Sequence, residues 1–449
     1  VVHEAKRTLL DSIGCALAGI TTDKGKISIE LARRLGGSPE SSIIGMGDKV
    51  SGCSAAFANG ELINALDYDT ILFPPGHVSP YVIPASLSVA ESSGASGKDL
   101  ILATVLGHEI STRLSHSLTS MVEVVQQGPE KVSIRWPQVS GFSQCIFGAT
   151  IGVGKILKLD HTKMSSALGI AGHFCPVPTF TKWARTVPSA MTKYESAGWL
   201  STAAVTAALL AEMGYVGDTT VFDGEYGFWR FFASEKWEPN AIMDRIGETW
   251  HFLNTTYKPY PCCRAMHGAL DCFISIIDNN NLMPEDIDSV KAYCQPLVEL
   301  PLWRNNELVT QVDAQFSVAY VFAAAAHRVK VGADWQDWDM MRNPKILEFM
   351  KKVSHQPHPG TAEARFKNPG FRPAMVEVVA KGKTFKEETM YAKGAPFTDA
   401  KTTDEELVKK FRSNASTILT QEKINEAVKS LLELEMVEDI AELVKQVTL

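Results

Sequence analysis

The chain has 449 residues and a formal net charge of −7, from 44 lysines and arginines against 51 aspartates and glutamates. At about 150 residues per domain, this length predicts two or three domains. The contents of 45% apolar and 21% charged residues are typical of a globular protein and exclude an extensively disordered chain. The mild acidic balance argues against a nucleic-acid partner, because phosphates favour a basic surface.

The cysteines and the chain start bear on metal binding and location. Eight cysteines are dispersed without any CxxC pair, which argues against a disulfide framework and a zinc ribbon, so we expect reduced thiols in a cytoplasmic protein. No run approaches the roughly 20 apolar residues that span a bilayer, so we expect no membrane partner. The chain begins at Val1 without an initiator Met and directly in a helical pattern. We therefore expect a missing upstream segment, with room for a targeting peptide.

Helical periodicity dominates the N-terminal half of the chain. Gly or Pro residues separate the segments that we expect to be helices, which are 4–18, 54–67, 80–94, 98–118, 140–158, 161–172 and 197–213. The last of these is rich in Ala and apolar on every side. Such a helix is buried all round, so we expect it at the centre of a helical bundle.

The pattern changes near residue 252, where strand signals appear among the helices. We expect one strand at 289–298, two strands at 374–391 with a turn near Gly382, and helices at 264–279, 313–327, 403–413, 421–434 and 436–447. The predicted fold class is therefore mainly α. We expect a large all-helical domain built from both chain ends (1–252 and 400–449), with a smaller inserted α+β lid domain (253–399) between them.

The first candidate site follows the helix predicted at 54–67. Asp67 and Asp69 precede His77, and the loop between them contains two prolines and a glycine. Loops at helix ends are common places for catalytic groups on a rigid scaffold. In the alternative interpretation, the two aspartates only terminate the helix and His77 is an ordinary loop residue.

The second candidate site is the stretch from Tyr257 to His267. Arg264 and His267 are spaced i, i+3, so they share one face of the helix that begins there, and Lys258 precedes them. The adjacent cysteines 262 and 263 are poor chelators, so acid–base chemistry or anion binding is favoured over a metal. A plain junction between a loop and a helix is the alternative.

The third candidate is Lys193, which precedes the Ala-rich helix, and we expect the adjacent Tyr194 to contribute to substrate binding. A lysine at the end of a buried helix can hold a substrate carboxylate or have a shifted pKa. The alternative is a solvated lysine at a helix start.

Several separated stretches, in order along nearly the whole chain, match one family. They include LDSIGCALAG (10–19), AFANG (56–60), ALDYD (65–69) with His77, GHEI (107–110), ALGIA (167–171), KPYPCCR (258–264) with His267, and FSVAY (316–320). The sequence resembles the MmgE/PrpD family, which includes 2-methylcitrate dehydratases, cis-aconitate decarboxylases and iminodisuccinate epimerase. The resemblance implies a helical domain formed from both termini, a smaller α+β lid, an active site between them, no metal or organic cofactor, and a homodimer.

The resemblance also implies site residues. Asp67, His77 and Lys193 fall on family positions in the helical domain, and His267 falls on the lid histidine. Two positions depart from the family pattern. Val139 stands where the decarboxylases and many dehydratases have a histidine, and Ile71 stands where the decarboxylases have a threonine. Two polar members of the decarboxylase site are therefore missing, which weakens that activity specifically.

The shared chemistry implied by the resemblance is removal of a proton next to a carboxylate, which requires a base and cations that offset the enediolate charge. We expect Lys193 with Arg264 or Lys258 to hold carboxylates, and His77 and His267 to move protons. Asp67 would orient a histidine. The leading expectation is a cofactor-independent lyase that dehydrates a 2-methylcitrate-like hydroxy acid.

Three alternatives to dehydration stay open. The missing histidine favours an epimerase or racemase of an iminodisuccinate-like dicarboxylate. The family also contains cis-aconitate-type decarboxylases. A non-enzymatic helical scaffold with a decayed pocket is a further alternative, and the joint retention of the four site residues argues against it.

Overall fold

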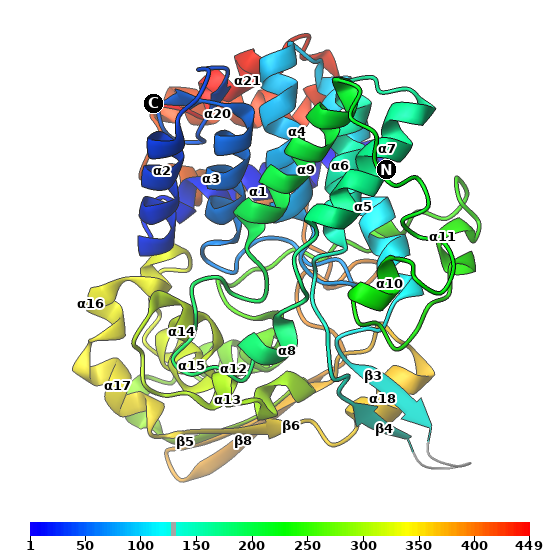
Figure 1. Cartoon of the computed structure of the whole chain (residues 1–449). Coiled ribbons are helices and arrows are strands. Elements are labelled where there is room, and N and C mark those ends of the chain that lie inside the picture. The colour runs from blue at the N-terminus through cyan, green and yellow to red at the C-terminus, as the bar shows by residue number, and fades with distance from the viewer. Residues whose placement is uncertain (127–131) are drawn as a thin grey trace.

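The computed structural model describes residues 1–126 and 132–449, and the described chain is mainly α-helical. Figure 1 shows long helices in the upper part of the molecule and a four-stranded sheet at the bottom. The helices of the upper part from the N-terminal half are α1 (Val2–Gly19), α2 (Asp23–Leu35), α3 (Gly52–Asn64), α4 (Ser79–Ser93), α5 (Gly97–Ser117), α6 (Cys145–Ile156), α7 (His161–Phe174) and α9 (Ala197–Glu212). All seven helices predicted for this half are present.

Helix α9 lies among α3, α4, α6 and α7, which confirms the prediction of a buried Ala-rich helix. Its small residues allow close packing. A Cβ atom on Gly198 would lie only 2.5 Å from the carbonyl oxygen of Phe57 on α3. The close approach of these helices brings the segment that precedes α9, with Lys193 and Tyr194, next to the C-terminal end of α3.

The two ends of the chain pack together. The C-terminal helices are α19 (Asp404–Ala415), α20 (Gln421–Leu432) and α21 (Ile440–Gln446). Of these, α19 and α20 contact α1, and α21 contacts α4. The red C-terminal helices accordingly lie beside the blue N-terminal ones in Figure 1. The division into a helical domain and a lid domain stays a prediction.

The sheet has the strand order β6-β5-β7-β8. Its strands are β5 (Ile287–Cys294), β6 (Val353–Pro357), β7 (Ala374–Ala380) and β8 (Lys383–Thr389). Strands β5 and β6 are parallel, whereas β7 is antiparallel to both β5 and β8. The turn at Lys381 and Gly382 has positive φ at both residues, which confirms the predicted hairpin.

Helices α12 (His267–Asn279) and α15 (Val318–Ala326) contact the sheet and each other, and they lie between the sheet and the upper helices. The segment predicted as one helix at 313–327 is in fact two, α14 (Gln311–Phe316) and α15. Ser317 separates them because its extended backbone ends the first helix while its side chain accepts a hydrogen bond from the backbone of Tyr320 and caps the second. The strand predicted at 289–298 ends at Cys294, because Pro296 begins a 3-10 turn.

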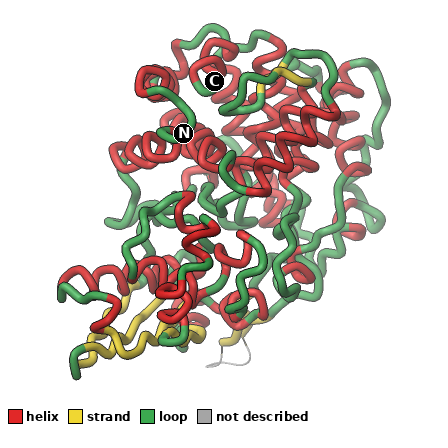
Figure 2. Tube along the Cα trace, turned by 90° about the vertical axis from the view of Figure 1, so that its left-hand side faces the viewer, coloured by secondary structure: helices red, strands yellow, loops and turns green. Residues whose placement is uncertain are grey.

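Short elements complete the chain (Figure 2). They are the antiparallel pairs β1 (Ser41–Ser42) with β2 (Lys49–Val50) and β3 (Glu123–Gln126) with β4 (Val132–Arg135), and the helices α8 (Phe180–Trp183), α10 (Phe228–Phe231), α11 (Asn240–Met243), α13 (Pro301–Arg304), α16 (Trp338–Met341), α17 (Pro344–Met350) and α18 (Thr361–Lys367). Within the described residues, no helix is both long and apolar enough to cross a membrane. The eight cysteines all belong to the described part and are free thiols.

Candidate active site

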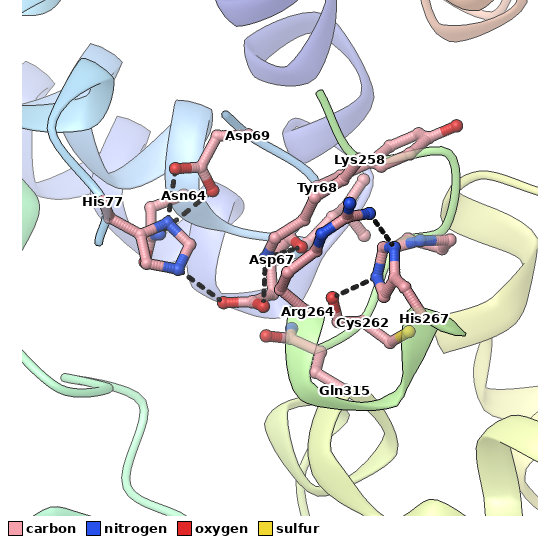
Figure 3. Close-up of polar contacts among 12 residues, drawn as sticks. Asn64, Asp67, Tyr68, Asp69, His77, Lys258, Cys262, Arg264, His267 and Gln315 are labelled. Carbon is pink, nitrogen blue, oxygen red and sulfur yellow. Dashed lines mark hydrogen bonds and ion pairs between the residues drawn. The ribbon is translucent and has the colours of Figure 1, made fainter. Parts of the chain in front are cut away.

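Asp67 is the centre of a buried polar cluster (Figure 3). It lies just beyond the end of α3 with φ 53°, a left-handed conformation that Asp tolerates better than most residues. Its Oδ1 accepts hydrogen bonds from Lys193 Nζ and the Tyr194 hydroxyl, both at 2.8 Å. Its Oδ2 accepts one from Lys258 Nζ at 2.6 Å. One carboxylate therefore joins two ammonium groups and a phenol from separate segments of the chain.

The ion pairs of Asp67 set the charges of the cluster. Burial acts to raise the pKa of Asp67, but the ammonium groups of Lys193 and Lys258 outweigh burial and hold that pKa well below its usual value. Burial lowers the pKa of Lys193 to about 8, against the opposing pull of Asp67. At neutral pH, Asp67 is therefore an anion and Lys193 is mostly protonated. Lys193 loses its proton only slightly above neutral pH.

His77 is oriented by a second aspartate. Its Nδ1 lies 2.6 Å from Oδ2 of Asp69, and its Nε2 lies 3.6 Å from Oδ1 of Asp67. The ring stacks on Tyr194 with 4.5 Å between ring centroids. Burial acts to raise the pKa of Asp69, but its interactions with His77, including their hydrogen bond, and the charge of Lys258 lower it. Asp69 is therefore ionised, and it places the ring hydrogen of His77 on Nδ1. Burial, opposed by Asp69, lowers the pKa of His77, so the neutral ring presents Nε2 as a proton acceptor.

Asn64, the last residue of α3, connects these groups. Its Nδ2 donates to the Tyr194 hydroxyl at 2.7 Å and to Oδ1 of Asp69 at 3.2 Å. Asp69 was named in the first candidate site without a role of its own, and Asn64 was not identified from the sequence. The available signal was the spacing of Asp69 and His77 around a proline-containing loop.

Arg264 and His267 form a pair beside the cluster, at a 3-10 turn that leads into α12. Arg264 Nη1 donates to Nδ1 of His267 at 3.2 Å, and Nε2 of His267 donates to the Cys262 carbonyl at 3.1 Å. Burial, followed by the positive charges of Arg264 and Lys258, holds the pKa of His267 well below its usual value. The imidazole is therefore neutral, and both of its nitrogens are hydrogen-bonded.

All seven candidate residues from the sequence come together in this region. In Figure 3, His77 lies on one side of Asp67, and Arg264 and His267 lie on the other. Lys258 links the two sides because it bonds Asp67 and its charge acts on His267. The seven candidates are Asp67, His77, Lys193, Tyr194, Lys258, Arg264 and His267. Lys193 and Lys258 are both paired with Asp67, and the charge of Asp271 acts on Arg264.

Two amide oxygens in the same region have no hydrogen-bond partner within the described chain. They are Oδ1 of Asn64 and Oε1 of Gln315, and both are buried. The assignment of the Gln315 amide is fixed, because its Nε2 donates to the Ala65 carbonyl and to Oε1 of Gln336. A buried acceptor without a donor is costly, so these oxygens are suited to receive a hydroxyl or ammonium group of a ligand.

A pocket borders the cluster at Lys193. Its other lining residues include Trp183, Thr192, Glu195 and Ser196. Burial raises the pKa of Glu195 to about 8, so its carboxyl is mostly protonated at neutral pH. The pocket therefore has no strong negative charge that would repel a carboxylate.

The two apolar residues that depart from the family pattern, Ile71 and Val139, are at least partly covered by the protein. Ile71 is buried, and its backbone pairs with that of Thr256 through hydrogen bonds of 2.9 and 2.8 Å. Val139 is half-buried in the segment before α6. Across residues 1–126 and 132–449, no group of three or more His, Cys, Asp or Glu side chains is placed to hold a metal ion.

Comparison with known proteins identifies the family. Residues 1–240 match the MmgE/PrpD N-terminal domain, and residues 260–434 match the MmgE/PrpD C-terminal domain. Cis-aconitate decarboxylase from Homo sapiens is 26% identical over 460 residues, covering 98% of this chain and 88% of the relative. The cis-aconitate decarboxylase-like protein oryM from Aspergillus oryzae is 24% identical over 99% of this chain and 92% of its own length. Cis-aconitate decarboxylase from Aspergillus terreus is 23% identical over 79% of this chain and 74% of its own length. Because the two domain matches together span most of the chain in the family's order, this protein belongs to the MmgE/PrpD family.

Proposed function

We propose that this protein is a lyase that acts on a small di- or tricarboxylate without a cofactor, by moving a proton at a carbon next to a carboxylate. The observation that carries the proposal is the buried cluster in which Lys193 and Lys258 meet at Asp67, with the Nε2 acceptor of His77 beside it. Such a cluster combines the base and the positive charge that formation of an enediolate requires.

The two lysines are the groups that bind the substrate. Each ammonium has three N–H donors. Lys193 uses two of them on Asp67 Oδ1 and the Asn64 carbonyl, and Lys258 uses two on Oδ2 and the carbonyl of Asp67. One donor of each lysine is left for a carboxylate or hydroxyl oxygen of the substrate. As the α-carbon loses its proton, the negative charge moves onto that carboxylate and the two cations stabilise it.

His77 is the base in this proposal. Asp69 holds the ring through Nδ1 and stabilises the imidazolium that forms when Nε2 takes the proton. His267 is less suited to this role, because both of its nitrogens are hydrogen-bonded to Arg264 and the Cys262 carbonyl. We therefore assign proton transfer to His77 and carboxylate binding to Arg264, whose guanidinium His267 helps to position.

The first candidate reaction is dehydration of a 2-methylcitrate-like hydroxy acid. The C–H bond next to the carboxylate breaks and its proton goes to His77, and the C–O bond of the neighbouring carbon then breaks. The leaving hydroxide takes a proton from Lys193, whose pKa of about 8 suits it as an acid, and departs as water. The free acceptors on Asn64 and Gln315 are suited to hold the hydroxyl before it leaves.

The second candidate reaction is decarboxylation of a cis-aconitate-like acid. It is favoured by the relatives from Homo sapiens and Aspergillus terreus, which are cis-aconitate decarboxylases at 26% and 23% identity. The apolar residues Ile71 and Val139 argue against it, since they supply no donor or acceptor at positions where the decarboxylases have polar side chains. Epimerisation of an iminodisuccinate-like dicarboxylate stays an alternative. A homodimer and a cytoplasmic location stay predictions.

The test is incubation of the purified protein with 2-methylcitrate and, separately, with cis-aconitate. Products are resolved by proton NMR, and carbon dioxide is trapped. We expect 2-methylcitrate to lose water and give an unsaturated tricarboxylate. Release of carbon dioxide from cis-aconitate alone would establish the second candidate. Absence of both reactions would overturn the lyase proposal.

A further inference from the structure

Five successive backbone carbonyls at the end of α3, from Asn64 to Tyr68, each accept a hydrogen bond from a buried side chain. The last carbonyls of a helix have no donors within the helix, and this end of a helix favours positive charge. In the order of the carbonyls, the donors are Lys193, Gln315, Gln336, Lys258 and Lys410, at distances of 2.7 to 2.9 Å. The turn that carries Asp67 is therefore fixed by side chains from five separate segments, two of which, Lys258 and Gln315, are drawn beside it in Figure 3.

Lys410, on α19, ties this turn to the segment that carries Lys258. Its Nζ donates to the Tyr68 carbonyl at 2.8 Å and to the Lys258 carbonyl at 3.1 Å, and it pairs with Oδ1 of Asp11 at 2.7 Å. An ammonium has three N–H donors, so none is left for a ligand. The side chain is 9% exposed, and its ammonium lies 3.6 Å from the ring centre of Tyr68. Lys410 therefore fixes the backbone of the residue that follows Asp67 against the backbone of Lys258.

Gln336 ties the same two segments together on the other side of Asp67. Its Nε2 donates to the carbonyls of Leu66 and Pro261, both at 2.9 Å. Its Oε1 accepts a hydrogen bond from Nε2 of Gln315 at 2.8 Å, so both ends of this buried amide are in use. The residues before and after Asp67 are thus each connected to the second segment by one side chain whose N–H donors are all occupied.

We propose that Lys410 and Gln336 are positioning residues, which hold the segment of Lys258 at the spacing from Asp67 at which their ion pair forms. The inference rests on the proposed function, in which Lys258 binds the substrate. Lys258 Nζ lies 2.6 Å from Oδ2 of Asp67, and this distance depends on the spacing of the two backbones. Loss of either connection lets the segments move apart, and a displacement of about 1 Å at a site can lower the rate about 100-fold. Both residues act through Lys258, since neither has a free donor for the substrate.

The test compares the steady-state kinetics of purified full-length variants on whichever of 2-methylcitrate and cis-aconitate the wild type converts. The variants are Lys410→Met and Gln336→Met, which keep an unbranched side chain of similar length and remove its donors. Lys410→Met leaves Asp11 as a buried carboxylate without its cation, so the uncharged Gln336→Met decides the test if that variant does not fold. The controls are Lys409→Met, an exposed neighbour on α19, and Gln421→Met at the exposed start of α20.

The separate values of kcat and KM, and a double-mutant cycle with Lys258→Met, distinguish positioning from a merely structural role. Loss of folded enzyme lowers kcat without changing KM, and it does so equally with or without Lys258. Positioning instead raises KM and lowers kcat, because Lys258 binds the carboxylate and stabilises the charge that develops on it. In the Lys258→Met background, the effect of each variant on kcat/KM should therefore shrink to less than about threefold. Slow variants are followed by accumulation of product in proton NMR.

We expect each of the two variants to lower kcat/KM about 10- to 100-fold, and both controls to match the wild type. Wild-type kinetics in Gln336→Met, an unchanged KM in both variants, or a loss of the same size with and without Lys258 overturns the inference while the proposed function stands. Equal losses in the two controls overturn it as well. Absence of any conversion by the wild type overturns the proposed function, and this inference with it.

Discussion

Substitution of Asp69 by Asn tests the proposed orientation of the base. The carboxylate lies 2.6 Å from Nδ1 of His77, and an ionised acceptor at this distance is worth about 1.5–3 kcal/mol. An Asn of the same shape removes the charge and can present an N–H to Nδ1, which favours the wrong tautomer of His77. At about 1.4 kcal/mol per factor of ten, we expect kcat/KM to fall about 10- to 100-fold.

The pH dependence of Asp69→Asn separates positioning from a merely structural role. His77 must be neutral to accept a proton, so kcat/KM falls on the acid side as His77 becomes protonated. The charge of Asp69 raises the pKa of His77 against the effect of burial. Its loss lowers that pKa, so the acid limb of the profile moves to lower pH in the variant. The assay is a kcat/KM profile, with Asp288→Asn on the exposed side of β5 as the control. A wild-type rate and an unmoved acid limb in Asp69→Asn would refute the reasoning.

Three further predictions follow from the same contacts. Asp67→Asn leaves the buried ammonium groups of Lys193 and Lys258 without their anion. The free energy of unfolding, measured in urea, should therefore fall by about 3–5 kcal/mol. An unchanged free energy of unfolding would contradict the proposed ion pairs. In the wild type, kcat/KM should decline above about pH 8 as Lys193 loses its proton, whereas a profile that stays level to pH 10 would remove Lys193 from substrate binding. Gly198→Ala places a Cβ 2.5 Å from the Phe57 carbonyl oxygen. The free energy of unfolding should fall by about 1–3 kcal/mol, which is measured as a lower melting temperature. A variant that melts at the wild-type temperature would show that α3 and α9 separate easily.

The sequence predicted the helices best where apolar residues recur with helical spacing, as in α1 and in the Ala-rich α9. It missed α2, whose exposed face carries many charged residues and whose first turn contains Gly25. It also missed β6, a five-residue strand whose pairing with β5 depends on a long connection. Local pattern contains no information on such a partner, so edge strands of this kind need tertiary contacts to be recognised.

The candidate site was predictable in its residue types but not in its connections. Asp67, Lys193 and Lys258 were each identified as candidates, yet their convergence on one carboxylate depends on the close packing of α3 against α9. The occupied nitrogens of His267 could not be foreseen either. Its two partners are a backbone carbonyl and an arginine whose side chain is held by the carbonyls of Ala392 and Lys393.

The central claim is that Nε2 of His77 moves a proton at a carbon next to a substrate carboxylate. The direct measurement is proton NMR of the converted substrate and product in D2O, with the wild type, His77→Gln, and His161→Gln at the exposed start of α7 as the control. The account predicts conversion coupled to exchange with solvent deuterium in the wild type and in His161→Gln, and loss of both conversion and exchange in His77→Gln. Conversion and exchange at the wild-type rate in His77→Gln would contradict the account.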